Sequence, residues 1–229
     1  MDFKGILSYS SRLAINNNRT WFHDNHTEYE KAKKDFYGFL DLLRFRISDI
    51  APELGKSIMY MEPKEWAYRI ARDMRYHKNG PPYNPAFRAY ISSDKKSDLP
   101  IGYFLRIAPG TSCFGTGVWC STTERMNSMR HYILDNFDYF QKLMDENNVS
   151  VSGDMLKKLP KGFTVEGAAA EYIKMKNWSV IVHISDEELT DFDTTADYLA
   201  ALVARMEPMR LFLLQGADYK KVIRPEFEW

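Results

Sequence analysis

Hydrophobic and polar residues follow two different spacings along this chain, and together they predict an α+β fold. Apolar residues three or four positions apart predict helices, whereas short apolar runs between turn residues predict strands. The helical spacing occurs at 3–15, 27–50, 122–146, 168–175 and 195–215. The strand pattern occurs at 86–91, 101–108, 111–120 and 178–184. We therefore expect one domain over 1–229, with helices packed on a small, mainly antiparallel sheet.

A hairpin over about 101–120 is expected at the centre of this sheet. Its two strands flank the turn dipeptide formed by Pro109 and Gly110. Gly115 and Gly117 lie in the return strand. Glycine inside a strand predicts either a bulge or the close approach of another segment.

Several residues mark where the predicted helices begin and end. A Ser or Thr followed three positions later by Glu forms a capping box. Such pairs occur at Thr27 and Glu30, at Ser121 and Glu124, and at Ser185 and Glu188. Asn136 predicts a break in the helix over 122–146, and Pro208 predicts a kink or a division of the last helix. Gly216 is expected to cap that helix at its C-terminal end.

Charge and composition argue against several classes of function. Lys plus Arg equals Asp plus Glu at 31 each, so no overall field draws the chain to nucleic acid or to a membrane surface. No run approaches about 18 apolar residues and no signal peptide is evident, so we expect a cytoplasmic protein without membrane spans. Cys113 and Cys120 lie in the predicted hairpin, where they either form a bridge or stay reduced as small hydrophobic residues.

The stretch 69–83 contains the densest group of residues that can bind an anion. A guanidinium group offers paired donors that match the oxygens of a carboxylate or a phosphate. The expected site has three anchoring arginines, an orienting aspartate and a tyrosine wall: Arg69, Arg72, Arg75, Asp73 and Tyr83. Its secondary structure stays open. A helix would pair Arg69 with Asp73, whereas a strand would place Arg72 on the face opposite the other charges.

Two further residues, Trp119 and His77, are candidates for this site. Trp119, near the end of the hairpin, is a second expected wall. If the protein is an enzyme, His77 or Asp73 would handle the proton, since the pKa of a histidine lies near neutrality.

Known catalytic and metal-binding patterns are absent from the sequence. It contains no Gly-x-Ser-x-Gly elbow, no His-Glu-x-x-His motif and no Rossmann fingerprint. His23, Asp24 and His26 would bind a metal only with a further carboxylate, and they also fit a solvated turn. We therefore expect neither a metal nor a cofactor.

The stretch 69–83 also resembles a known family. The order Arg69, Arg72, Asp73, Arg75, Tyr76, Pro82 and Tyr83 is similar to the Arg-x-x-Arg-Asp-x-Arg-Phe stretch, followed by Pro and Tyr, of the conserved-hypothetical bacterial family called domain of unknown function 2461. Segments similar to its other signatures occur at 17–22, 102–105, 115–119 and 159–163. The resemblance implies one α+β domain centred on this stretch, and no particular reaction.

The chain departs from the family pattern just after Lys78. Asn79 and Gly80 stand where the family usually has Asp and Lys, and Asn84 replaces a further Lys. If the family's lysines bind a ligand, binding in this chain is altered or lost.

Two hypotheses remain open from the sequence. In the first, the arginines line a pocket for a small anionic ligand, either a phosphate or a carboxylate. In the second, the protein is a non-enzymatic interaction or structural module, and the arginines form an internal salt-bridge network. Ligand-binding arginines should face a cavity, whereas structural arginines should be buried and paired with carboxylates or carbonyls. The sequence indicates no oligomeric state.

Overall fold

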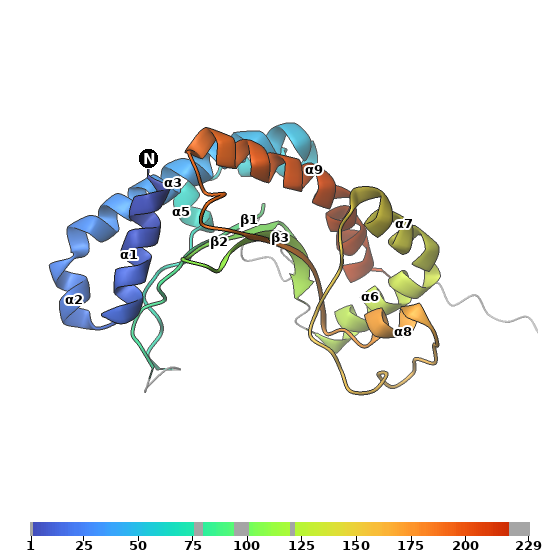
Figure 1. Ribbon diagram of the computed structural model, residues 1–229. Helices are drawn as coiled ribbons and strands as arrows, with labels where there is room; N and C mark the ends of the chain where they lie inside the picture. Colours follow the sequence, from blue (N-terminus) through green and yellow to red (C-terminus); the bar gives the residue numbers. More distant parts are fainter. Residues whose placement is uncertain (1, 76–79, 94–100, 120–121, 220–229) are drawn as a thin grey trace, which may run out of the picture. The chain divides into compact units, whose positions relative to one another are not determined.

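The computed structural model describes residues 2–75, 80–93, 101–119 and 122–219, which form nine helices and four strands (Figure 1). The helices are α1 (Phe3–Ile15), α2 (Arg19–Asp24), α3 (His26–Ile50), α4 (Pro52–Ile58), α5 (Pro63–Trp66), α6 (Thr123–Asp135), α7 (Phe137–Asn147), α8 (Ala168–Ile173) and α9 (Phe192–Ala217). The strands are β1 (Phe87–Ile91), β2 (Tyr103–Ile107), β3 (Ser112–Trp119) and β4 (Asn177–Ile184). They form one antiparallel sheet in the order β1-β2-β3-β4, so the predicted α+β class is confirmed.

The chain packs into two compact units. The first comprises Met1–Lys96, Gly102–Gly115 and Ile181–Ala204. The second comprises Ser97–Ile101, Thr116–Val180 and Arg205–Trp229. β3, β4 and α9 each contribute residues to both units. That 1–229 behaves as one domain stays a prediction.

In the first unit, α1 and α3 cover one face of the β1–β2 ladder. Phe87 of β1 packs its ring against Tyr9 of α1 and Phe36 of α3, with centroids 6.4 and 5.6 Å away. The next residue, Arg88, pairs directly with Arg106 of β2. Because successive strand residues point to opposite faces, the two arginines lie on the face away from Phe87.

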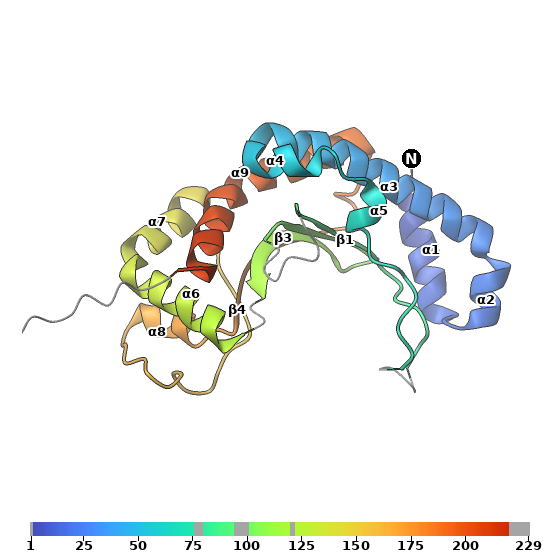
Figure 2. The same cartoon turned by 180° about the vertical axis from the view of Figure 1, so that it is seen from behind.

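The core of the second unit lies among α6, α7, α8 and the C-terminal part of α9 (Figure 2). The ring of Phe140 on α7 lies 4.9 Å from Tyr172 of α8 and 5.2 Å from Phe212 of α9, between centroids. Trp178 of β4 is fully buried, and its indole Nε1 donates to the carbonyl of Tyr172 at 3.0 Å. Aromatic packing therefore joins α7, α8 and α9, and the hydrogen bond of Trp178 attaches β4 to α8.

The close approach predicted from the hairpin glycines is confirmed at Gly117. A Cβ atom there would lie 2.7 Å from the side chain of Ser179 and 2.7 Å from the carbonyl of Trp178. Only glycine lets β4 pass this close to β3.

Two short helices were not expected from the spacing. α2 begins after Asn18, whose side chain accepts a hydrogen bond from the backbone of Trp21 at 2.9 Å. α4 begins with Pro52 in its first turn, where a missing N–H group costs no hydrogen bond. Helices of six or seven residues are too short to show a helical period.

Two of the predicted helix starts need correction, and a third falls partly outside the described residues. α3 begins at His26 after Asn25, so Thr27 lies inside the first turn and does not cap the helix. Ser185 and Glu188 do form the reciprocal pair, with the N–H of Ser185 donating to Glu188 at 2.7 Å. Residues 186–188 nevertheless form a turn and not the expected helix. Ser121 lies outside the described residues, and α6 is capped by Thr122.

The last helix also differs from its prediction. α9 runs from Phe192 to Ala217, so the division at Pro208 is wrong, whereas the alternative of a kink there stays a prediction. Gly216 is a helical residue and does not cap the helix. It lies against α6, where a Cβ atom on residue 216 would be 2.7 Å from the sulfur of Met129. The break predicted at Asn136 is confirmed, since this residue separates α6 from α7.

A membrane span requires a long apolar helix, and the helices within the described ranges include none.

Candidate anion-binding site

The first part of the arginine stretch is extended. The N–H of Tyr68 donates to the carbonyl of Arg88 in β1 at 2.9 Å, and Ala67 bridges to Ala89. Further along, the N–H of Arg72 donates to the carbonyl of Pro82 at 2.8 Å. The strand alternative left open by the sequence is therefore the one that the backbone adopts over 67–72. It aligns this segment with the edge of the sheet.

The predicted anchors lie in different surroundings. Arg69 is exposed. Arg75 has 82% of its side chain exposed, and its Nε and Nη2 donate to the carboxylate of Asp73 at 3.0 and 2.6 Å. This hydrogen bond raises the pKa of Arg75. Arg72 is half-buried and donates from Nε to the carbonyl of Tyr83 at 3.2 Å.

Tyr83 joins the arginine stretch to the N-terminal signature. The amide of Asn17 donates to the carbonyl of Tyr83 at 3.0 Å and accepts from its N–H at 3.0 Å. The ring of Tyr83 stacks on Phe22 of α2, with 4.1 Å between centroids and 15° between planes. Two motifs that are 66 residues apart in the sequence thus meet in the first unit. The contacts fix the position of Tyr83.

The other two predicted site residues lie outside the described part of the first unit. Trp119 ends β3 in the second unit and is 50% exposed. His77 lies outside the described residues, as does Cys120, the partner in the bridge alternative. Over the described ranges, no three His, Cys, Asp or Glu side chains gather closely enough to form a metal site.

The sequence analysis missed two arginines, and the charge of Arg72 acts on one of them, Arg88. Arg88 of β1 and Arg106 of β2 are directly opposite each other in the ladder. Burial first, and then the charges of Arg106 and Arg72, lower the pKa of Arg88, whereas Tyr68 opposes the change. We call Arg72, Arg88 and Arg106 the arginine cluster. Like charges directly opposite each other destabilise a sheet, so this pairing is a signal for function.

Within the described ranges, the arginine cluster has no carboxylate partner. The Nε of Arg88 is buried without a hydrogen-bond acceptor, and its guanidinium carbon lies 5.3 Å over the ring of Tyr68. Arg106 donates from Nη2 to the hydroxyl of Thr111 at 3.3 Å. Among the residues that the structure describes, no carboxylate lies within ion-pair distance of the three guanidinium groups.

The sequence contained a signal for this cluster that the stretch 69–83 obscured. Arg88 and Arg106 are the polar members of two alternating strand patterns. To place them opposite each other one needs the register between β1 and β2, which the residue pattern alone does not give.

The comparison with known families agrees with the family resemblance stated from the sequence. The profile of the family described as Conserved hypothetical protein (DUF2461) matches residues 5–212. The chain belongs to this family. The match spans both the N-terminal signature and the arginine cluster. No curated protein and no solved structure matches the chain.

Proposed function

We propose that this DUF2461 protein binds a small anionic ligand, a phosphate or a carboxylate, at Arg72, Arg88 and Arg106. The observation that carries the proposal is the Arg88–Arg106 pair, in which two cations lie opposite each other without a carboxylate nearby in the described part of the chain. An anion with two or more oxygens would accept from both guanidinium groups and remove their repulsion. Arg72 would supply donors other than its Nε, which already donates to Tyr83.

Arg69, Asp73 and Arg75 have a secondary place in this proposal. Arg75 forms its ion pair with Asp73, and both arginines are exposed. They would supply the outer field that attracts an anion, and the arginine cluster would bind it. We also propose a cytoplasmic location, because the chain has only two cysteines, which fits a reducing compartment. The family resemblance supports a bacterial source.

The structural alternative is also supported by one observation. Arg72 donates to the carbonyl of Tyr83, so it helps to keep the two ends of the stretch together. Under this alternative the arginines stabilise the fold, and an interaction surface carries the function.

Calorimetric titration with sodium phosphate and sodium succinate separates the two functions. We expect Arg72→Lys and Arg88→Met to weaken binding by about tenfold or more, because a lysine cannot make the paired bonds of a guanidinium group. Arg46→Met is the matched control, since Arg46 also lies in the first unit but pairs with Asp197 at 2.7 Å. An absence of binding to wild type, together with early melting of Arg72→Lys, would favour the structural alternative.

A further inference from the structure

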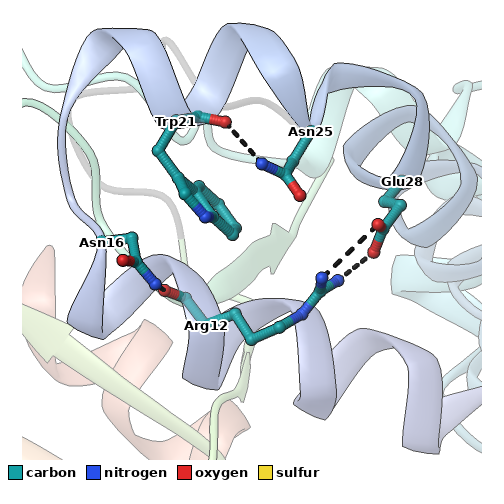
Figure 3. Close-up of polar contacts among 5 residues, drawn as sticks. All are labelled: Arg12, Asn16, Trp21, Asn25 and Glu28. Atoms are coloured by element: carbon teal, nitrogen blue, oxygen red, sulfur yellow. Dashed lines mark hydrogen bonds and ion pairs between the residues drawn. The ribbon is translucent and has the colours of Figure 1, made fainter.

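Residues at the junction of α1, α2 and α3 in the first unit bond to one another. Arg12 of α1 pairs with Glu28 of α3, as Figure 3 shows. The amides of Asn16 and Asn25 donate to the backbone carbonyls of Arg12 and Trp21, at 3.0 and 2.8 Å. A ligand at this junction would have to break these contacts. The outer edge of β4 is different.

β4 lies at an edge of the sheet, because the strand order is β1-β2-β3-β4. The backbone bonds of Ser179 show which way this strand directs its polar groups. Ser179 donates to the carbonyl of Ser152 and accepts from its N–H, both at 2.8 Å, and Ser152 lies outside the four strands. Alternate residues of an antiparallel strand direct their N–H and C=O groups to the same side. Ile181 and His183 therefore direct theirs to the outer edge, away from β3.

The chain covers the opposite edge of the sheet but leaves this part of β4 uncovered. The segment over 67–72 lies along β1, where the N–H of Tyr68 donates to the carbonyl of Arg88 at 2.9 Å. No backbone N–H or C=O group of the described ranges bonds to the outer side of Ile181 or His183. Both residues are exposed, Ile181 at 40%. An uncovered row of backbone donors and acceptors is a template for another strand.

Acidic residues follow directly after this edge. Asp186, Glu187 and Glu188 form the turn at the end of β4. Asp186 accepts from the N–H of Gly110 at 3.0 Å, and Glu188 accepts from that of Ser185 at 2.7 Å, so these two carboxylates are held in place. Glu187 is exposed. The negative charges of this turn favour a segment that carries a cation.

We propose that the outer edge of β4 over 181–184 binds an extended basic segment of a partner protein. The segment runs antiparallel to β4, as Ser152 does, and exchanges backbone hydrogen bonds with Ile181 and His183. One of its apolar side chains covers the exposed Ile181. A Lys or Arg near the N-terminal end of the segment lies beside Glu187. The residues of this chain that contact the segment all belong to the first unit.

Calorimetric titration of the full chain with a synthetic peptide tests this inference. The probe is Lys-Lys-Thr-Val-Thr-Val-Thr with both ends blocked, which joins a basic start to residues that favour strands. We expect it to bind about tenfold more tightly than the same peptide with Glu in place of both Lys, which meets like charges at the turn. A peptide N-methylated on every Thr and Val should also bind about tenfold more weakly or worse, because it cannot donate to the edge. No binding of the basic peptide at millimolar concentration, or equal binding of either control peptide, would overturn the proposal.

His183→Pro is the sharpest variant. Proline removes the N–H that residue 183 directs to the outer edge and leaves the bonds between β4 and β3 in place. We expect its affinity for the basic peptide to fall by about tenfold, whereas His183→Ala, the matched control that keeps the N–H group, should bind like wild type. Equal affinities of the two variants would contradict the assignment of this edge.

Glu187→Lys tests the charge preference outside the strand. This variant should bind the basic peptide more weakly than wild type and the Glu peptide more tightly, because the sign of the exposed charge is reversed. The exchange of preference decides the case even if His183→Pro does not fold. An unchanged preference would contradict the choice of a basic partner.

Sedimentation of wild type without peptide tests a different occupant of this edge, a second copy of the chain. We expect a monomer. A wild-type dimer that His183→Pro dissociates would overturn the proposal, since the edge would then serve self-association.

Discussion

Arg130 and Arg210 in the second unit differ from the arginine cluster of the first unit in what their guanidinium groups contact. Arg130 is 2% exposed and donates to the carbonyls of Ile173 and Met175, both at 2.9 Å. Arg210 is 3% exposed, and its Nε and Nη2 donate to the carboxylate of Glu207 at 2.7 Å. These two arginines have the contacts expected of structural residues.

The arginine cluster has the opposite character. Arg88 buries its Nε without an acceptor and lies opposite another arginine. Arginine therefore has two kinds of surroundings in this protein, and the partners of the guanidinium group distinguish them. We infer that an arginine that is buried and fully paired stabilises the fold, and we propose that one that is partly buried and has no described carboxylate partner binds a ligand. Three changes test this distinction, and a fourth tests the burial of Tyr29 in the first unit.

Removal of Arg210 should have the largest effect on stability. Arg210→Met takes the ion-pair partner from Glu207, whose side chain is 14% exposed. Loss of one partner from a buried ion pair lowers the free energy of unfolding by about 3 kcal/mol or more. Urea denaturation measures the change. The double variant Arg210→Met with Glu207→Leu should recover part of the loss, and a loss below about 1 kcal/mol in the single variant would contradict the structural role.

Removal of Arg130 should have a smaller effect of the same sign. Arg130→Met leaves the buried carbonyls of Ile173 and Met175 without these donors. We expect the free energy of unfolding to fall by about 2 kcal/mol, because neutral carbonyls cost less to leave unpaired than a carboxylate. The same denaturation series checks the order of the two effects. Equal stability of Arg130→Met and wild type would remove the basis of the comparison.

Removal of Arg88 should change stability in the other direction. Arg88→Met ends the repulsion with Arg106 and removes the unpaired Nε. We expect the free energy of unfolding to stay the same or rise by up to about 1 kcal/mol. Leu105→Met on β2 is a control for side-chain volume without a change of charge. A loss above about 1 kcal/mol in Arg88→Met would class this arginine with Arg130.

A further effect is expected on the helical side of the first unit, and only at high pH. Burial raises the pKa of Tyr29 from 10.0 to about 12, with further contributions from Tyr37 and Glu30. The unfolded chain therefore releases this proton first, so the stabilisation is complete below pH 10 and is lost as the pH rises through about 12. Tyr29→Phe should flatten the decline in stability over this range. A decline equally steep in the variant would contradict this assignment.

Much of the fold followed from local pattern. The helix over 3–15 and the hairpin over about 101–120 were predicted because their spacing and turn residues are local signals. α2 and α4 were missed because one or two turns show no period. The predicted end of α9 was wrong because Gly216 lies inside the helix and packs against Met129. This contact is distant in sequence, so the local pattern does not show it.

Local sequence pattern predicted only part of the candidate site. Arg72 and Tyr83 were found because they lie in one dense stretch, and their mutual contact was not foreseen. Arg88 and Arg106 were missed because their proximity depends on strand register.

The most direct test of the account is urea denaturation of wild type and Arg88→Met, each with and without phosphate at about 100 times the wild-type dissociation constant. For wild type we predict a stabilisation by phosphate of about 2.7 kcal/mol. Arg88→Met should be at least as stable as wild type without phosphate and should gain little from it. Equal stabilisation of both proteins, or an Arg88→Met variant that is unstable without phosphate, would contradict the claim that the arginine cluster is kept unneutralised for an anion.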